Sequence, residues 1–317
     1  MRRTLLLLLL LAGAAVAVLG VFLFGSMGTN WEYILSRRLV RVGAMVLTAG
    51  CIGVSSLLFQ TITGNRILTP SVIGLDSLYL FVQTTAVFFG SHWLHALADP
   101  IVNYAVSLSA LGLFAVLLAV VLFQRAQRDL FRVLLIGMVL GTLFGSLTTF
   151  MQVLLDPNEF LTLQARMFAS MNRVNAELLV PSFAVLVPLV IGLVRWSRTF
   201  DVLALGRETA IALGVDYRRV ITVSMLGIAL AVAVATALVG PLTFLGIVVT
   251  NLTYQVLRTW RHRELLVGVL LVSIVAVVGG QLVVERVFAF ATPLNVVVNL
   301  IGGIYFFVLL LRERVVW

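Results

Sequence analysis

The sequence predicts an all-helical integral membrane protein of about ten spans, and three observations predict it. Hydrophobic residues make up 61% of the 317 residues. Charged residues make up only 11%, against about 25% in an average soluble protein. Apolar runs long enough for a helix to cross the hydrocarbon core recur along the whole chain. Because so few charges cannot cover a water-exposed surface, most of the exterior must face lipid.

Ten apolar runs predict the membrane spans, and no linker separates them, so we expect one transmembrane domain over residues 1–317. The first run follows Met1-Arg2-Arg3 but continues to Phe24 without a charge. A signal-peptide core has roughly 7–15 residues, which favours a retained span over a cleaved signal. The eighth run is short and follows Gly240-Pro241, which indicates a broken or tilted helix. The runs are 5–24, 42–59, 72–89, 101–123, 133–155, 178–194, 220–239, 242–257, 265–284 and 294–311.

The basic residues predict the orientation. All 22 are arginine, and they lie between the apolar runs, a pattern typical of membrane flanks rather than of a nucleic-acid partner. With both termini in the cytoplasm, 16 of the 22 face the cytoplasm and 6 face the other side. This bias predicts a multi-pass chain with an even number of spans and both ends inside.

The composition also argues against catalysis by this chain. Without lysine there is no Walker A loop and no lysine Schiff base, so any ATPase that drives transport must be another chain. The single cysteine, Cys51, lies in an apolar run and cannot form an intrachain disulfide. His92, His95 and His262 fall in predicted loops near different interfaces, so we expect no metal site.

Ionisable residues within the spans are scarce. Only Asp76 lies clearly inside an apolar run, and Glu285 lies at a span end. Two roles stay open for Asp76: a cap of a helix break around Gly74, which we favour, or a relay group with Glu285 in an ion-coupled secondary carrier. The scarcity of buried charge indicates that energy is supplied from outside the membrane domain.

Two loops carry most of the remaining signal. The outer loop 156–177 predicts a short interfacial helix. The inner loop 195–219 is the most charged, and it contains a helical stretch, 201–215, that Gly206 and Gly214 interrupt. Such a stretch either inserts into a groove of a partner or packs on the inner ends of the bundle itself.

Three patterns resemble the iron-chelate uptake ABC permeases, a family that includes the membrane subunit of the cobalamin importer. The inner loop resembles the family's cytoplasmic coupling loop. A turn after the seventh span resembles the corresponding segment of the family. The stretch around the second and third spans resembles the family's signature of glutamine, asparagine, proline and glycine. Arg38 and Arg41 resemble an arginine pair at the outer start of the second span. The matching residues are Leu203, Leu205, Gly206, Ala210, Leu213 and Gly214 in the loop, Gly240, Pro241 and Gly246 in the turn, and Gln60, Asn65, Pro70 and Gly74 in the signature.

The resemblance implies an ABC importer type II permease fold and a role in transporting a ferric siderophore across the bacterial cytoplasmic membrane. Residues 68–79 look more like the subgroup for catecholate siderophores than like the cobalamin branch. Implied partners are two ABC ATPase subunits that use ATP, a sister permease rather than a second copy, and a siderophore-binding protein. This chain would then bind no cofactor of its own.

The resemblance also implies roles for particular residues. The loop residues would contact the ATPases, and the signature residues would lie near the path. Arg38, Arg41 and Arg286 would dock the binding protein, the alternative being that they anchor the chain at the interface. Threonine, serine, asparagine, glutamine and methionine side chains on the second, fifth and tenth spans would suit the path itself.

Overall fold

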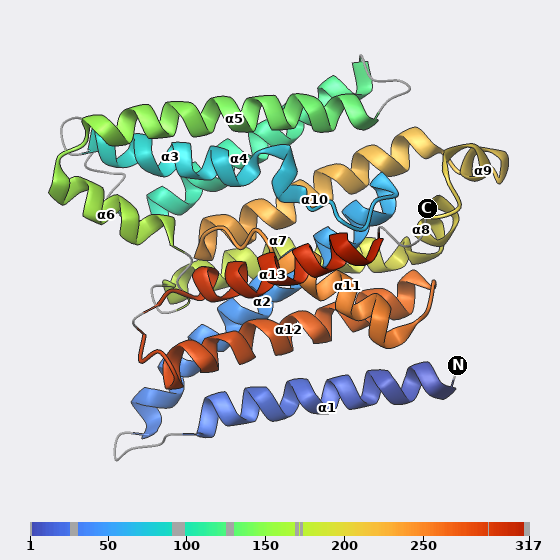
Figure 1. Ribbon diagram of the computed structural model, residues 1–317, viewed down its shortest axis with the longest axis horizontal. Helices are drawn as coiled ribbons and strands as arrows, with labels where there is room; N and C mark the ends of the chain where they lie inside the picture. Colours follow the sequence, from blue (N-terminus) through green and yellow to red (C-terminus); the bar gives the residue numbers. More distant parts are fainter. Residues whose placement is uncertain are drawn as a thin grey trace.

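The computed structural model describes residues 2–25, 31–90, 99–124, 130–168, 171, 174–290 and 292–313. Within these residues every regular element is a helix, which confirms the predicted all-helical class. The helices form one bundle in which the long ones run side by side (Figure 1). Their bounds are α1 Arg2–Phe24, α2 Trp31–Thr63, η1 Pro70–Ile73, α3 Leu75–Gly90, α4 Pro100–Gln124, α5 Leu130–Leu154, α6 Pro157–Met167, α7 Ala176–Arg195, α8 Ser197–Leu203, α9 Arg207–Ala212, α10 Tyr217–Val239, α11 Leu245–Leu257, α12 His262–Arg286 and α13 Leu294–Glu313.

Each of the ten predicted runs overlaps one helix. Among the described residues, seven helices are long and apolar enough to cross a membrane, and α3, α11 and α13 are shorter apolar helices. The helix α1 begins and α13 ends at the same end of the bundle, where α8 and α9 also lie (Figure 1). The opposite end carries α6. We refer to these as the α8–α9 end and the α6 end.

The helix α2 forms the centre of the bundle. Of its most apolar stretch, 83% is buried within the chain, against 11% for α1, which leaves α1 facing lipid. Small residues let the neighbouring helices approach α2 closely: Gly53 lies directly against Ser273 of α12. The buried Cys51 that the sequence predicts lies in this helix.

Two half-length helices interrupt the pattern of full spans. With 13 residues, α11 is about 20 Å long, shorter than the roughly 30 Å hydrocarbon core. Both α3 and α11 begin inside the bundle and run toward opposite ends (Figure 1). Each follows a turn with a glycine in the left-handed region, Gly74 (φ 89°) and Gly240 (φ 103°). The short eighth span that the sequence predicts is thus confirmed, and α3 shares its form.

The loop predictions have mixed outcomes. The outer loop contains α6, as expected. The inner loop contains α8 and α9, separated near Gly206, and α8 begins at Ser197 rather than at residue 201. The loop position predicted for His262 is wrong, because His262 is the first residue of α12 and only 2% exposed. His92 and His95 lie outside the described residues.

Candidate functional site

An open, uncharged hollow of about 800 Å³ lies along one face of α5. The α5 residues that line it recur every three or four positions, so they share one side of the helix. Hydroxyls, glycines and a methionine form the lining, and none of these described lining residues is charged. They are Met138, Gly141, Thr142, Gly145, Ser146 and Thr149 on α5, with Ser71, Val72, Gly74 and Ser77 opposite them.

Glycines set the distance across this hollow. A Cβ atom on Gly74 would lie 2.8 Å from the carbonyl oxygen of Gly137 and 2.9 Å from Cα of Gly141. The turn at Gly74 therefore packs backbone to backbone on α5, and its positive φ further favours glycine. Sequence reasoning missed Gly137 and Gly141, although glycine at 137, 141 and 145 follows the small-residue spacing of close helix packing.

Asp76 links the beginnings of the two half-length helices. Its carboxylate Oδ2 accepts a hydrogen bond of 3.1 Å from the Thr243 hydroxyl, which precedes α11. The Ser71 hydroxyl lies near the same carboxylate. These hydroxyl partners differ from the backbone N–H groups of the expected cap. Glu285, the other half of the alternative relay pair, lies at the end of α12 beside Arg38, so the fold does not bring the two carboxylates together.

Most other signature residues shape the turns rather than line the hollow. Pro70 begins η1, and the Asn65 side chain accepts from the Ile67 N–H at 2.9 Å. Gly246 lies against Ser56 and Thr69 with no room for a Cβ atom, so the two turn segments meet in the core. Gly240 and Pro241 form the second turn and are buried.

The second span does not line an open path, contrary to expectation. Its polar side chains point into the bundle, where Gln60 is 2% exposed and its amide finds no hydrogen-bond partner among the described residues. On α13 the asparagines also turn inward, because Asn295 is buried and Asn299 partly so. Of the three spans proposed for the path, α5 alone presents an exposed polar face in this chain. The buried uncharged polar residues of α2 are Thr48, Ser55, Ser56 and Gln60.

The inner loop presents one buried and one exposed side. Leu203 and Ala210 are buried, Ala210 completely, where α9 contacts α8 and α10. Leu205 and Leu213 are each 61% exposed, and Ile211 is 51% exposed. Gly206 (φ 96°) and Gly214 (φ 84°) turn the chain at either end of α9. One side of the loop thus packs on the inner ends of the bundle, and insertion of the exposed side into a partner stays a prediction.

A chain of hydrogen bonds ties this loop to two spanning helices. Asp201 Oδ1 on α8 lies 2.7 Å from the backbone nitrogen and 2.8 Å from the ring Nδ1 of His262. The other ring nitrogen, Nε2, lies 2.8 Å from Thr61 Oγ1 at the end of α2. Sequence reasoning missed this cluster, because no local pattern joins residues so far apart along the chain.

The predicted docking arginines have different surroundings. Arg38 is only 7% exposed, and its Nη1 donates to the Phe22 and Leu23 carbonyls at 2.9 and 3.0 Å. Its Nη2 lies 3.7 Å from the Glu285 carboxylate. A docking role for Arg38 therefore does not fit its placement, because the side chain clamps the end of α1 to the bundle.

The other two arginines stay nearer the surface. Arg286 is exposed and donates to the Gly25 carbonyl at 3.1 Å, which also holds the end of α1. Arg41 is partly buried, while Arg37 is exposed and lies over the Tyr33 ring at 5.1 Å. Arg37, which sequence reasoning did not select, is thus more accessible than Arg41.

Comparisons with known proteins agree with this architecture. The sequence model of the FecCD transport family matches residues 4–312. The petrobactin import system permease protein YclO of Bacillus subtilis (strain 168) is 48% identical over 309 residues, covering 97% of this chain and 98% of YclO. FatC of Bacillus anthracis, which carries the same description, is 32% identical over 295 residues, 89% of this chain and 79% of FatC.

Two further comparisons bear on assembly and fold. YclN, a second petrobactin import system permease protein of Bacillus subtilis (strain 168), is 25% identical over 288 residues, 88% of this chain and 86% of YclN. A solved structure of a metal-chelate type ABC transporter in an inward-facing conformation superposes with a TM-score of 0.84. It is 23% identical and covers 98% of this chain and 99% of that one, so it shows the same fold.

Proposed function

The chain belongs to the FecCD transport family, and from that premise we propose that it forms half of the path by which an ATP-driven importer takes up a ferric siderophore. The observation that carries the proposal is the 48% identity to a petrobactin import permease over nearly the full length of both chains. The chain is a transport component of an ABC importer and not an enzyme. A petrobactin-like chelate, of the catecholate type that the sequence favours, is the proposed cargo.

The hollow on α5 suits such cargo. A permease that receives a chelate from a tightly binding partner needs weak contacts inside, so that the chelate leaves as readily as it enters. Glycine, serine, threonine and methionine provide such contacts, because they present small dipoles and polarisable surface without a fixed charge. The uncharged lining is therefore a reason to place the path along α5.

A sister permease is proposed to close the path. Two different proteins of one organism, YclO and YclN, carry the description of petrobactin import permease. This chain is 48% identical to one and 25% identical to the other, which supports a counterpart of YclO that pairs with a second, YclN-like polypeptide. The open face of α5 would then meet that polypeptide across a shared central hollow.

Energy would reach the path through α8 and α9. The exposed Leu205, Ile211 and Leu213 form an apolar knob that fits insertion into a groove of an ATPase subunit. Since the chain has no lysine, ATP would be bound and hydrolysed in two such partner chains and not here. The arginine bias supports a cytoplasmic location for this end and both termini.

The α6 end would then face a siderophore-binding protein. Arg37 is exposed and Arg41 partly so near that surface, and acidic groups of the binding protein would pair with them. Such pairing steers association more than it fixes affinity. The bacterial cytoplasmic membrane is the location proposed for the assembly.

The test is uptake of a radioactive iron chelate by a deletion strain with and without the chain. We expect uptake of ferric petrobactin to disappear on deletion and return on complementation, while uptake of a trihydroxamate chelate is unchanged. Uptake should stop on ATP depletion and continue when only the membrane potential is dissipated. Accumulation driven by the potential alone would favour the ion-coupled carrier with Asp76 and Glu285 and would refute the proposal.

A further inference from the structure

A second hollow lies on a different face of the bundle and has a different character. It has a volume of about 630 Å³ and is lined by thirteen residues of α4, α7 and α10 and of the α7–α8 junction. Twelve of them are apolar, glycine or aromatic, and Arg195 is the one charged residue in this described lining. We call this hollow the α7–α10 groove.

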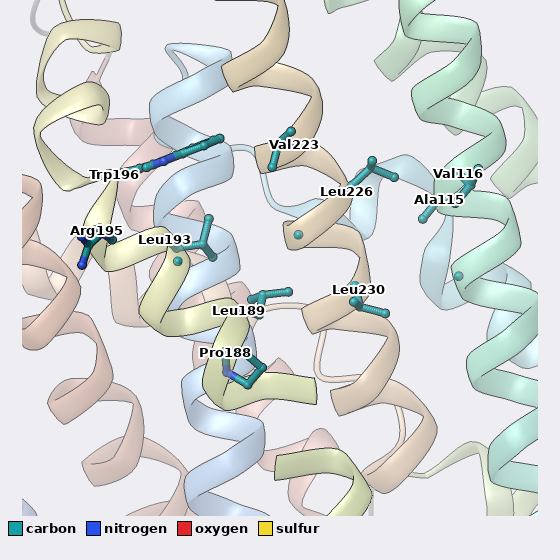
Figure 2. Close-up of a pocket in the computed structure, with 13 residues that line it drawn as sticks. Ala115, Val116, Pro188, Leu189, Leu193, Arg195, Trp196, Val223, Leu226 and Leu230 are labelled. Carbon is teal, nitrogen blue, oxygen red and sulfur yellow. The ribbon is translucent and has the colours of Figure 1, made fainter. Parts of the chain in front are cut away.

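Glycines keep the groove open. A Cβ atom on Gly112 or Gly192 would meet nothing within 4 Å, so there is free space above both residues. Leu189 and Leu193 point from α7 toward α10, where Leu226 and Leu230 lie (Figure 2). The groove follows α7 from residue 188 to residue 196, roughly 12 Å at the rise of an α-helix.

One end of the groove carries an aromatic ring and positive charge. Trp196 extends from the end of α7 toward Val223 and covers that end (Figure 2). Arg195 is exposed beside it. Arg219, also exposed, lies one helical turn before Val223 and therefore on the same side of α10. Tryptophan and arginine at the end of an apolar groove are typical of the membrane–water interface.

We propose that the α7–α10 groove binds one phospholipid with an anionic head group. Its acyl chain lies between the leucines of α7 and α10, and its phosphate lies between Arg195 and Arg219. Basic sites between spanning helices on the cytoplasmic side recognise such head groups. The apolar part is wide enough for an acyl chain, because three helices contribute to it and each of them lines it with a glycine.

A sister permease is a weaker candidate for this groove. The hollow proposed for the path lies on α5, whereas α7 packs mainly on α2 and α10, and α10 packs mainly on α2 and α4. The groove thus opens on another side of the bundle, where the surrounding medium is lipid. A bilayer of bacterial type supplies anionic phospholipids at that surface.

A lipid bound in the α7–α10 groove would affect the coupling of ATP hydrolysis to transport. The reason is that Trp196 both caps the end of α7 and precedes α8. A lipid held under its ring braces the junction through which the spanning helix α7 continues into the coupling helices. This consequence rests on the proposed function, whereas lipid binding does not.

The test is lipid retention by the assembled importer, purified from vesicles of phosphatidylglycerol and phosphatidylcholine in equal amounts and measured by native mass spectrometry. Wild type should retain phosphatidylglycerol. Gly192→Leu, which fills the groove, should abolish retention, and Arg195→Gln should weaken it about fivefold, the effect of one arginine near an anionic surface. Matched controls are Gly13→Leu on the exposed face of α1 and Arg263→Gln at the same end of the bundle, and both should behave as wild type.

Three results would overturn the proposal. The first is equal retention of phosphatidylglycerol by all variants, and the second is retention of phosphatidylcholine equal to that of phosphatidylglycerol by the wild type. The third is a disulfide between Gly192→Cys and a cysteine introduced at successive positions of the sister permease. Siderophore uptake is measured separately. If the chain binds the lipid but transports a cargo other than a ferric siderophore, the lipid-binding inference holds and the proposed function fails.

Discussion

Asp201 of α8 contacts His262 twice, at the backbone nitrogen (2.7 Å) and at the ring Nδ1 (2.8 Å). This backbone N–H belongs to the first turn of α12, where N–H groups have no carbonyl partner within the helix. The carboxylate also pairs with the ring Nδ1, and the ring Nε2 lies 2.8 Å from the Thr61 hydroxyl oxygen. One side chain of α8 thus holds the start of α12 and, through the ring, the end of the buried α2.

We expect Asp201→Ala to uncouple ATP hydrolysis from uptake. Loss of the carboxylate leaves a buried N–H and a buried imidazole unsatisfied, at about 1–3 kcal/mol, so α8 can move without moving α12. The measurement is ATP hydrolysed per chelate imported by the reconstituted importer, which should rise. Asp201→Asn keeps an acceptor for the backbone N–H and should restore part of the coupling. An unchanged ratio in Asp201→Ala would show that the contact is only structural.

Charges on the exposed side of α8 and α9 should prevent the proposed ATPase binding. Leu205→Asp combined with Leu213→Asp puts carboxylates on an apolar surface that the chain itself does not cover. We expect the ATPases to be lost on co-purification while the permease pair remains in the membrane at wild-type amounts. Ala210→Arg is the contrast, because Ala210 is fully buried and an arginine there should reduce the amount of folded chain. Undiminished co-purification of the ATPases with the double variant would contradict this surface.

Gly74→Ala should destabilise the chain. At φ 89° the new Cβ is strained by roughly 1–2 kcal/mol, and it would also meet the Gly137 carbonyl oxygen at 2.8 Å. A lower thermal midpoint of the purified importer is the expected result. Gly145→Ala is the control, since Gly145 lines the same hollow but has open space around its Cβ position. Equal midpoints for the two variants would mean that the turn is not held against α5.

The arginines at the α6 end should separate into two classes. Arg38→Ala removes the side chain that holds the end of α1. The Phe22 and Leu23 carbonyls and the Glu285 carboxylate lose their contacts with Arg38, so we expect a less stable chain. Arg37→Ala and Arg41→Ala should leave stability unchanged and slow association of the binding protein, most strongly at low salt. The measurement is the rate of association of the binding protein with each variant at several salt concentrations, which separates docking arginines from structural ones. A rate that falls for Arg38→Ala in a chain of wild-type stability would restore it as a docking residue.

The extent of prediction from sequence follows from what each feature depends on. A span depends on a run of apolar residues, so the positions of the ten apolar helices could be predicted. Whether Gln60 and Arg38 are buried depends on how each helix is rotated toward its neighbours. The lipid-facing and protein-facing sides of a membrane helix are both apolar, so the sequence does not encode that rotation. Asp201, His262 and Thr61 meet because three helix ends converge, and their separations along the chain are 61 and 201 residues. No local spacing could have joined them.

A bulky side chain in the hollow on α5 should block transport without affecting assembly. Thr142→Trp projects an indole into the space between α5 and the Gly74 turn, while Leu143→Trp, on the next residue, replaces a side chain that is 51% exposed and does not line the hollow. Because a tryptophan fills much of a site sized for a small ligand, we expect uptake to fall at least about tenfold in Thr142→Trp alone. ATPase binding should be retained in both, since α8 and α9 are untouched. Equal uptake in the two variants would place the path on another face of the bundle.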